Sequence, residues 1–150
     1  MYRYIEGSGR DPHNRQAFPW HEPETWDVTT LEHTKEIGKL RADHEALRRG
    51  GLRWRGATSA DGGEEKNSLV VWERFFDDAA DGANALCLFH SGRGSGTGVM
   101  RVKTGFGAGV ALRAIFDSAG GAGAAAMVTD DEGCVTLDVE AQAGLVLVPA

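Results

Sequence analysis

The stretch Gly50-Gly51-Leu52-Arg53-Trp54-Arg55-Gly56 marks the point at which the pattern of this 150-residue chain changes. Before it, apolar side chains recur every three or four residues, which is the period of an α-helix. Within it, apolar and charged residues alternate, which is the period of a β-strand. The sequence therefore predicts a helical segment and a β-rich C-terminal part that meet at about residue 50.

Seven further strand-like segments follow, separated by clusters of glycine, aspartate and serine. They span 68–76, 85–90, 99–103, 110–116, 124–128, 135–139 and 145–148. Eight short strands in about 100 residues are typical of a β-sandwich or barrel. Asp130-Asp131-Glu132-Gly133 is expected to form a hairpin turn between the sixth and seventh strands.

One helix is predicted from about residue 30 to residue 47. Its apolar positions recur at three, four and three residues: Ile37, Leu40, His44 and Leu47. Thr29 or Thr30 is the expected N-cap, and Glu32 is expected in the first turn, where a negative charge opposes the helix dipole. Gly50-Gly51 is expected to supply a left-handed exit. Residues 1–28 show no sustained period and are expected to form either an ordered loop held by aromatic side chains or a loop that requires a partner.

The charge balance excludes some partners. With 16 Lys and Arg against 22 Asp and Glu, the net charge is −6, which argues against nucleic acid because phosphate binding depends on clustered basic residues. The arginines at 48, 49, 53 and 55 are interpreted as a solvated edge. No run approaches the roughly 20 apolar residues of a membrane span. The segment Met1–Glu6 lacks the apolar core of a signal peptide, so a cytoplasmic location and no membrane partner are expected.

No metal site, cofactor or catalytic group is predicted. Cys87 and Cys134 lack metal-ligand spacing and are interpreted as buried free thiols. The glycine-rich run 92–98 precedes the strand-like segment 99–102 rather than a helix, which favours an inter-strand loop over a phosphate cradle. Glycosidic cleavage needs two suitably placed carboxylates. The acids of the N-terminal loop, Glu6, Asp11, Glu22 and Glu24, lie in no string that resembles such a pair.

Trp54 and Trp72 lie in the first two predicted strands. A tryptophan in a strand of a small sandwich is most often a core residue, and this interpretation is favoured here. The alternative is a sugar-stacking platform, because an aromatic face packs against the C–H surface of a pyranose ring. That alternative requires the tryptophans to emerge on one exposed face of the sheet.

Two strings together resemble glycoside hydrolase family 13, the α-amylase family, and in particular its neopullulanase- and cyclomaltodextrinase-like members. The first is Asp11-Pro12-His13-Asn14-Arg15-Gln16-Ala17-Phe18-Pro19-Trp20, and the second is Leu40-Arg41-Ala42-Asp43-His44-Glu45-Ala46-Leu47-Arg48-Arg49-Gly50. The resemblance covers residues 4–50 by motif and residues 51–150 by pattern alone. The second string departs from the family at Glu45, where proline is usual.

The resemblance implies a domain organisation. Residues 1–50 look like the end of a (β/α)8 barrel, a loop followed by the eighth helix, and residues 51–150 look like the C-terminal β-sandwich known as domain C. The expected fold is therefore mainly β, with one long helix before the sandwich. By the same resemblance, Asp11 and Arg15 would bind substrate hydroxyls at the barrel's cleft. The family's catalytic carboxylates lie upstream of this motif.

The resemblance also implies a function. The chain is expected to be the C-terminal fragment of an α-glucan-acting, retaining glycoside hydrolase, supporting the barrel without being catalytic alone, with an α-glucan oligosaccharide as the substrate of the parent enzyme. The alternative is a free-standing β-sandwich that binds carbohydrate or protein. Apolar residues of the first 50 positions that would face the barrel also predict self-association through this segment.

Overall fold

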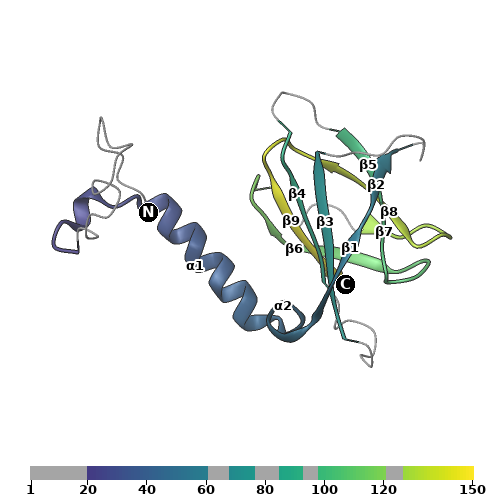
Figure 1. The fold of residues 1–150 in the computed structure, drawn as a ribbon, viewed down its shortest axis with the longest axis horizontal. Helices are drawn as coiled ribbons and strands as arrows, with labels where there is room; N and C mark the ends of the chain where they lie inside the picture. Colours follow the sequence, from purple (N-terminus) through teal and green to yellow (C-terminus); the bar gives the residue numbers. More distant parts are fainter. Residues whose placement is uncertain (1–19, 61–67, 77–84, 93–97, 121–126) are drawn as a thin grey trace. The chain divides into compact units, whose positions relative to one another are not determined.

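The computed structural model of the chain describes residues 20–60, 68–76, 85–92, 98–120 and 127–150 (Figure 1). The chain divides into two compact units, Met1–Lys39 and Leu40–Ala150. Among the described residues, no helix is both long enough and apolar enough to cross a membrane.

The first unit contains a short 3-10 helix, η2 (Pro23–Thr25), and the beginning of helix α1 (Val28–Asp43). Helix α1 is capped by Asp27, whose Oδ1 accepts the backbone N–H of Thr30 at 3.0 Å. The expected N-cap, Thr29 or Thr30, is therefore wrong, and Glu32 lies beyond the first turn. The hydrogen bonds from Thr30 lower the pKa of Asp27 below its ordinary value. The Asp27 carboxylate is a better cap here than a threonine hydroxyl, because it accepts hydrogen bonds from both the hydroxyl and the backbone N–H of Thr30.

The predicted single helix is interrupted. Helix α1 ends at Asp43, and a second helix, α2 (Glu45–Arg49), begins after His44, whose extended backbone (φ −112°, ψ 108°) breaks the helical path. Gly50 ends α2 with φ −61° and ψ 153°, so the expected left-handed exit is also wrong. The glycine is required for a different reason, because a Cβ at this position would lie 2.6 Å from the Ala46 carbonyl oxygen.

Nine described strands form two antiparallel sheets (Figure 1). The strands are β1 (Gly51–Arg55), β2 (Ala57–Ser59), β3 (Leu69–Phe75), β4 (Ala85–His90), β5 (Gly98–Lys103), β6 (Ala111–Asp117), β7 (Met127–Val128), β8 (Cys134–Val139) and β9 (Gly144–Pro149). The larger sheet has the order β1-β3-β4-β9-β6-β7, and the smaller sheet has the order β2-β5-β8. The chain passes from one sheet to the other at Gly56, between β1 and β2.

The expected mainly-β fold is confirmed, and the two sheets enclose one core as in a β-sandwich. The core draws on both sheets: Leu69, Val71, Leu86, Leu88, Leu112 and Leu147 from the larger one, and Ala57, Met100, Val102, Val135, Leu137 and Val139 from the smaller one. Each of the eight expected strands has a counterpart among the described strands, and β2 was not expected. Residues 124–126 of the sixth expected strand lie outside the described residues.

The expected turn at residues 130–133 is present, since the Gly133 N–H donates to the Asp130 carbonyl at 2.8 Å. It does not close a hairpin within one sheet. The strand before it, β7, pairs with β6, and the strand after it, β8, pairs with β5. The turn therefore carries the chain from the larger sheet to the smaller one.

Candidate functional site: an exposed aromatic face

The larger sheet presents apolar side chains on its outer surface. We call these residues the aromatic face: Leu52 and Trp54 of β1, Val70 and Trp72 of β3, and Phe89 of β4. Successive residues of a strand point to opposite faces, so Val70 and Trp72 point away from the buried residues Leu69, Val71 and Glu73. The pairing Trp54↔Trp72 and Val70↔Phe89 makes these side chains direct cross-strand neighbours.

Most of the aromatic face is accessible. The exposed fraction is 67% for Trp54, 49% for Leu52, 42% for Phe89 and 40% for Val70. Trp72 is half-buried, and its ring lies 6.4 Å from that of Trp54 at an interplanar angle of 66°. An edge-to-face tryptophan pair of this kind is held by the ring quadrupoles as well as by area burial. The pair therefore gives a fixed apolar surface at the edge of the sheet.

Helix α2 lies against the same side of the sheet. Arg74 stands two residues after Trp72 and so shares its face, and its Nε donates to the Ala46 carbonyl at 3.2 Å. Ala46 itself is buried. Cys87, the cross-strand partner of Trp72, is also buried, and desolvation raises the pKa of its thiol to about 11, with Arg74 acting in the opposite direction. This thiol is therefore inert at neutral pH.

A buried ion pair fixes β1 to β3 behind the aromatic face. Arg55 donates from Nε and Nη2 to one oxygen of Glu73, with an Nε–Oε2 distance of 3.0 Å. The Glu73 side chain is 1% exposed, and its second oxygen has no hydrogen-bond partner in the described structure. Gly105 lies over the pair, because a Cβ there would meet Arg55 Nη2 and would lie 2.5 Å from Glu73 Oε1. A larger residue at this position would require the ends of these two side chains to move.

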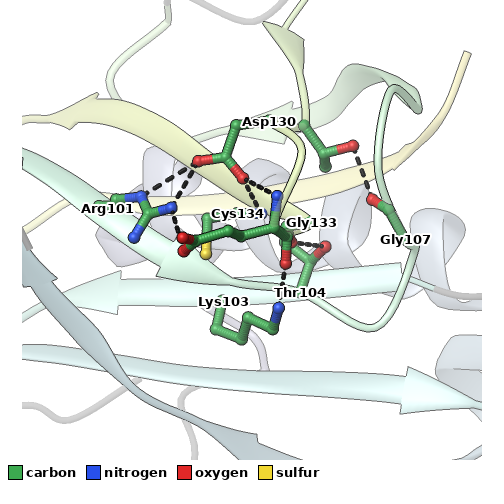
Figure 2. Close-up of polar contacts among 9 residues, drawn as sticks. Arg101, Lys103, Thr104, Gly107, Asp130, Gly133 and Cys134 are labelled. Atoms are coloured by element: carbon green, nitrogen blue, oxygen red, sulfur yellow. Dashed lines mark hydrogen bonds and ion pairs between the residues drawn. The ribbon is translucent and has the colours of Figure 1, made fainter.

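A polar cluster joins the turn at residues 130–133 to the smaller sheet (Figure 2). One carboxylate oxygen of Asp130 accepts the backbone N–H groups of Cys134 at 2.8 Å and Glu132 at 3.0 Å. The other accepts from Arg101 of β5 at 2.7 Å. The Cys134 amide and then Arg101 lower the pKa of Asp130, while Glu132 and Asp130 raise the pKa of Arg101.

Further bonds in Figure 2 hold the flanking loops. The Thr104 hydroxyl donates to the Gly133 carbonyl at 2.7 Å, and the Thr129 hydroxyl donates to the Gly107 carbonyl at 2.7 Å. Lys103 donates to the Glu132 carbonyl. Every donor and acceptor named here serves a turn or a strand end, so we interpret the cluster as structural.

Three further carboxylates among the described residues, those of Asp117, Asp138 and Glu140, line a hollow of about 400 Å³ whose other walls are mainly small and apolar residues. Within the described ranges, no three His, Cys, Asp or Glu side chains are placed to hold a metal ion. His90 is buried, and its Nδ1 lies 3.0 Å from the Val139 carbonyl, which fixes the donor tautomer at that nitrogen.

The residues singled out from the sequence have different outcomes. Asp11, Arg15, Glu6 and most of the glycine-rich run 92–98 lie outside the described residues. The core interpretation of Trp54 is wrong, because β1 is an edge strand and its outer side chains have no covering layer. Cys87 and Cys134 are buried free thiols, as expected.

The arginine edge is more ordered than the sequence suggested. Arg49 pairs with Glu45 at 3.1 Å, Arg53 lies over the Phe75 ring at 4.1 Å, and Arg55 is committed to Glu73. The first two contacts lie at the surface, whereas the Arg55–Glu73 pair is largely buried. The spacing of the arginines in the sequence does not distinguish an exposed arginine from a buried one.

Leu52, Val70 and Phe89 were not recognised as a surface from the sequence. A usable signal existed in strands β3 and β4. Leu69-Val70-Val71-Trp72 and Ala85-Leu86-Cys87-Leu88-Phe89 are continuous apolar runs. Strands of this kind are normally covered on both faces, whereas strands with one solvated face alternate.

Comparison with known proteins adds no assignment. No protein-family model matches the chain, and no curated protein matches it.

Proposed function

We propose that this chain is the C-terminal part of an α-glucan-acting glycoside hydrolase of the α-amylase type, with its sandwich in the role of domain C. In this role the sandwich supports a catalytic barrel and performs no chemistry by itself. The substrate of the whole enzyme is an α-glucan oligosaccharide, and Asp11 and Arg15 would contact it at the barrel's cleft.

One observation carries the proposal. The string that resembles the family ends at Gly50, and the first strand of the antiparallel sandwich begins at Gly51. A helix that leads without a linker into a β-sandwich is the order expected at the junction of barrel and domain C. The interruption at His44 also agrees with this reading, because the family usually has proline at the next position, and proline restricts the residue before it to extended backbone.

The test begins with the DNA immediately before the Met1 codon. The proposal expects a reading frame that encodes Asn-His-Asp and, further upstream, a glutamate in a barrel context. The purified 150-residue chain should release no reducing sugar from soluble starch, pullulan or β-cyclodextrin above a buffer blank. Turnover that an acidic-residue variant removes would contradict the supporting role.

The alternative function is a free-standing sandwich that binds carbohydrate, and the observation that favours it is the exposed Trp54–Trp72 pair. Affinity electrophoresis in gels with and without soluble starch separates the two functions. Retarded migration of the chain that Trp54→Ala abolishes would favour the alternative. Equal migration in both gels favours the supporting role.

A further inference from the structure

We propose that the helical segment contains a two-state joint at His44, which exchanges between the bent form of the structure and one continuous helix. We call the two residues that hold the bent form the arginine brace: Arg41 and Arg48. The joint does not depend on the proposed function of the sandwich.

The arginine brace crosses the break in both directions. Arg41 of α1 donates from Nη1 to the Leu47 carbonyl of α2 at 2.6 Å, and Arg48 of α2 donates from Nη1 to the Ala42 carbonyl of α1. Both arginines are exposed, so each bond competes with water and contributes only modestly to stability. The His44 side chain makes no capping bond to α2. The bent form therefore depends on weak, exposed contacts.

The residues around the break favour a helix on both sides of it and across it. Eight of the ten residues from 40 to 49 are Leu, Ala, Arg or Glu, which are strong helix formers. Position 45 is glutamate, so no proline forces the residue before it into extended backbone. The apolar spacing of Leu40, His44 and Leu47 also continues across the break. The local sequence is therefore compatible with one helix that joins α1 to α2.

The bent form and a continuous helix satisfy the same backbone groups in different ways. In the bent form, the Ala42 carbonyl accepts from the arginine brace, and the Leu47 N–H donates to the His44 carbonyl at 3.1 Å. In a continuous helix, each N–H donates to the carbonyl four residues before it. The Ala42 carbonyl would then accept from Ala46, and the Leu47 N–H would donate to Asp43. Because hydrogen bonds are exchanged between the two forms, their free energies lie close together, which is the condition for a two-state element.

The sandwich side of the joint is fixed in both forms. Arg74 of β3 donates from Nε to the Ala46 carbonyl at 3.2 Å, and the Gly50 N–H donates to the same carbonyl at 3.0 Å. Ala46 is buried, and these contacts use none of the groups that the two forms exchange. A binding partner that contacts residues on both sides of His44 would shift the equilibrium by the difference between its affinities for the two forms.

Nuclear magnetic resonance of the 150-residue chain tests the joint. Relaxation dispersion detects exchange on the μs–ms timescale, and the Cα chemical shift of His44 differs between extended and helical backbone. In the wild-type chain we expect exchange at the amides of residues 43–47, with a minor form whose His44 shift is helical. Glu45→Pro should abolish this exchange, because proline holds the residue before it in extended backbone.

Removal of the arginine brace should favour the continuous helix. In the double variant Arg41→Ala and Arg48→Ala, we expect the ratio of continuous to bent helix to rise by roughly fivefold, because two hydrogen bonds of the bent form are lost. Arg49→Ala is the matched control, since Arg49 is also exposed but pairs with Glu45 inside α2. Its ratio should change by less than about twofold. Unchanged amide shifts of β8 in every variant would show that the sandwich stays folded.

The outcomes separate the joint from a rigid bend. A helical His44 shift in the double variant supports the joint even where the minor form of the wild-type chain is too rare to detect. An unchanged ratio and an extended His44 shift in that variant would overturn the proposal. Exchange that persists in Glu45→Pro would also overturn it, because the exchange would belong to another motion. An equal rise in Arg49→Ala would assign the effect to the helix propensity of alanine and would overturn the role of the brace.

Discussion

The two sheets of the sandwich use the same core but differ on their outer surfaces. The outer side of β5 and β8 carries mostly polar residues, Arg101, Lys103, Thr136 and Asp138 beside Val99, whereas the outer side of β1, β3 and β4 carries mostly tryptophan, phenylalanine and aliphatic residues beside Arg74. Antiparallel strands with one face in water alternate in polarity, and strands covered on both faces do not. The comparison teaches that two sheets that share one core can differ in the polarity of their outer faces.

Each of the two sheets contains an arginine–carboxylate cluster among the described residues, and the two clusters differ in burial. The Arg55–Glu73 pair lies with side chains 16% and 1% exposed, while Asp130 and Glu132 around Arg101 are 42% and 71% exposed. Removing one partner of a buried ion pair leaves the other charge in a medium that solvates it poorly, whereas water replaces the partner of a surface charge at little cost in free energy. We therefore expect the largest loss of stability when the buried pair is broken.

Arg55→Ala should destabilise the sandwich by about 3–5 kcal/mol, because Glu73 then remains buried without a counter-charge. Arg101→Ala, the matched control in the smaller sheet, should cost about 0–1 kcal/mol. Urea unfolding followed by tryptophan fluorescence measures both. Equal losses in the two variants would contradict the assignment of one pair to the interior and the other to the surface.

Leu147→Ala should cost about 2–5 kcal/mol, because a fully buried leucine of the shared core leaves a cavity when it is truncated. Thr136→Ala, on the outer face of the smaller sheet, should change the free energy of unfolding by less than about 0.5 kcal/mol. The midpoints of urea unfolding decide the matter. A large loss in the threonine variant would contradict the exposed position of Thr136 on the outer face of the smaller sheet.

Glu45→Pro tests the corner where α2 meets the larger sheet. His44 already has the extended backbone that a following proline requires, and position 45 is the first residue of α2, where proline is favoured. Proline restricts the unfolded chain, which should add about 0.4–1 kcal/mol to the free energy of unfolding. Loss of the Glu45–Arg49 ion pair should lower it by about 0.3–0.5 kcal/mol. The net change in stability should therefore be small. A loss above about 2 kcal/mol, comparable to a core substitution, would show that the break at His44 is misplaced.

The smallest effect concerns pH at the turn of the smaller sheet. The folded pKa of Asp130 lies below the ordinary 3.8, so its stabilising effect is present above that value and is lost as the pH falls through the folded pKa. The amide resonance of Cys134, whose N–H donates to Asp130, should shift in this acid range. In Asp130→Asn the shift should vanish. An unchanged titration in that variant would assign it to another group.

The sequence predicted eight of the nine described strands, but it did not predict strand β2 or the break in the helix at His44. The eight expected strands have counterparts because alternation and turn residues are local signals. Strand β2 was missed because its three residues follow β1 after a single glycine, and a strand that short has too few positions to show a period. The break at His44 was missed because the apolar spacing of Leu40, His44 and Leu47 continues across it.

For the candidate site, too, the sequence identified residues but did not decide whether they are buried or exposed. The sequence identified Trp54 and Trp72 and offered both a core and a surface interpretation, with the core favoured. The choice depended on which strand stands at the edge of the sheet. That order, β1-β3-β4, follows from pairings between residues about 20 positions apart, as in Trp54↔Trp72, and no local pattern carries it.

By itself, the sequence determined the mainly-β class, the position of the helical segment and the turn at residues 130–133, since each depends on residues near in the chain. Only the tertiary structure decided that Arg55 and Glu73 form a buried pair under Gly105, that the turn joins two sheets, and that Trp54 is exposed. The physical reason is that burial belongs to the whole packing. A side chain's period fixes the direction in which it points, and long-range strand pairing fixes what it meets there.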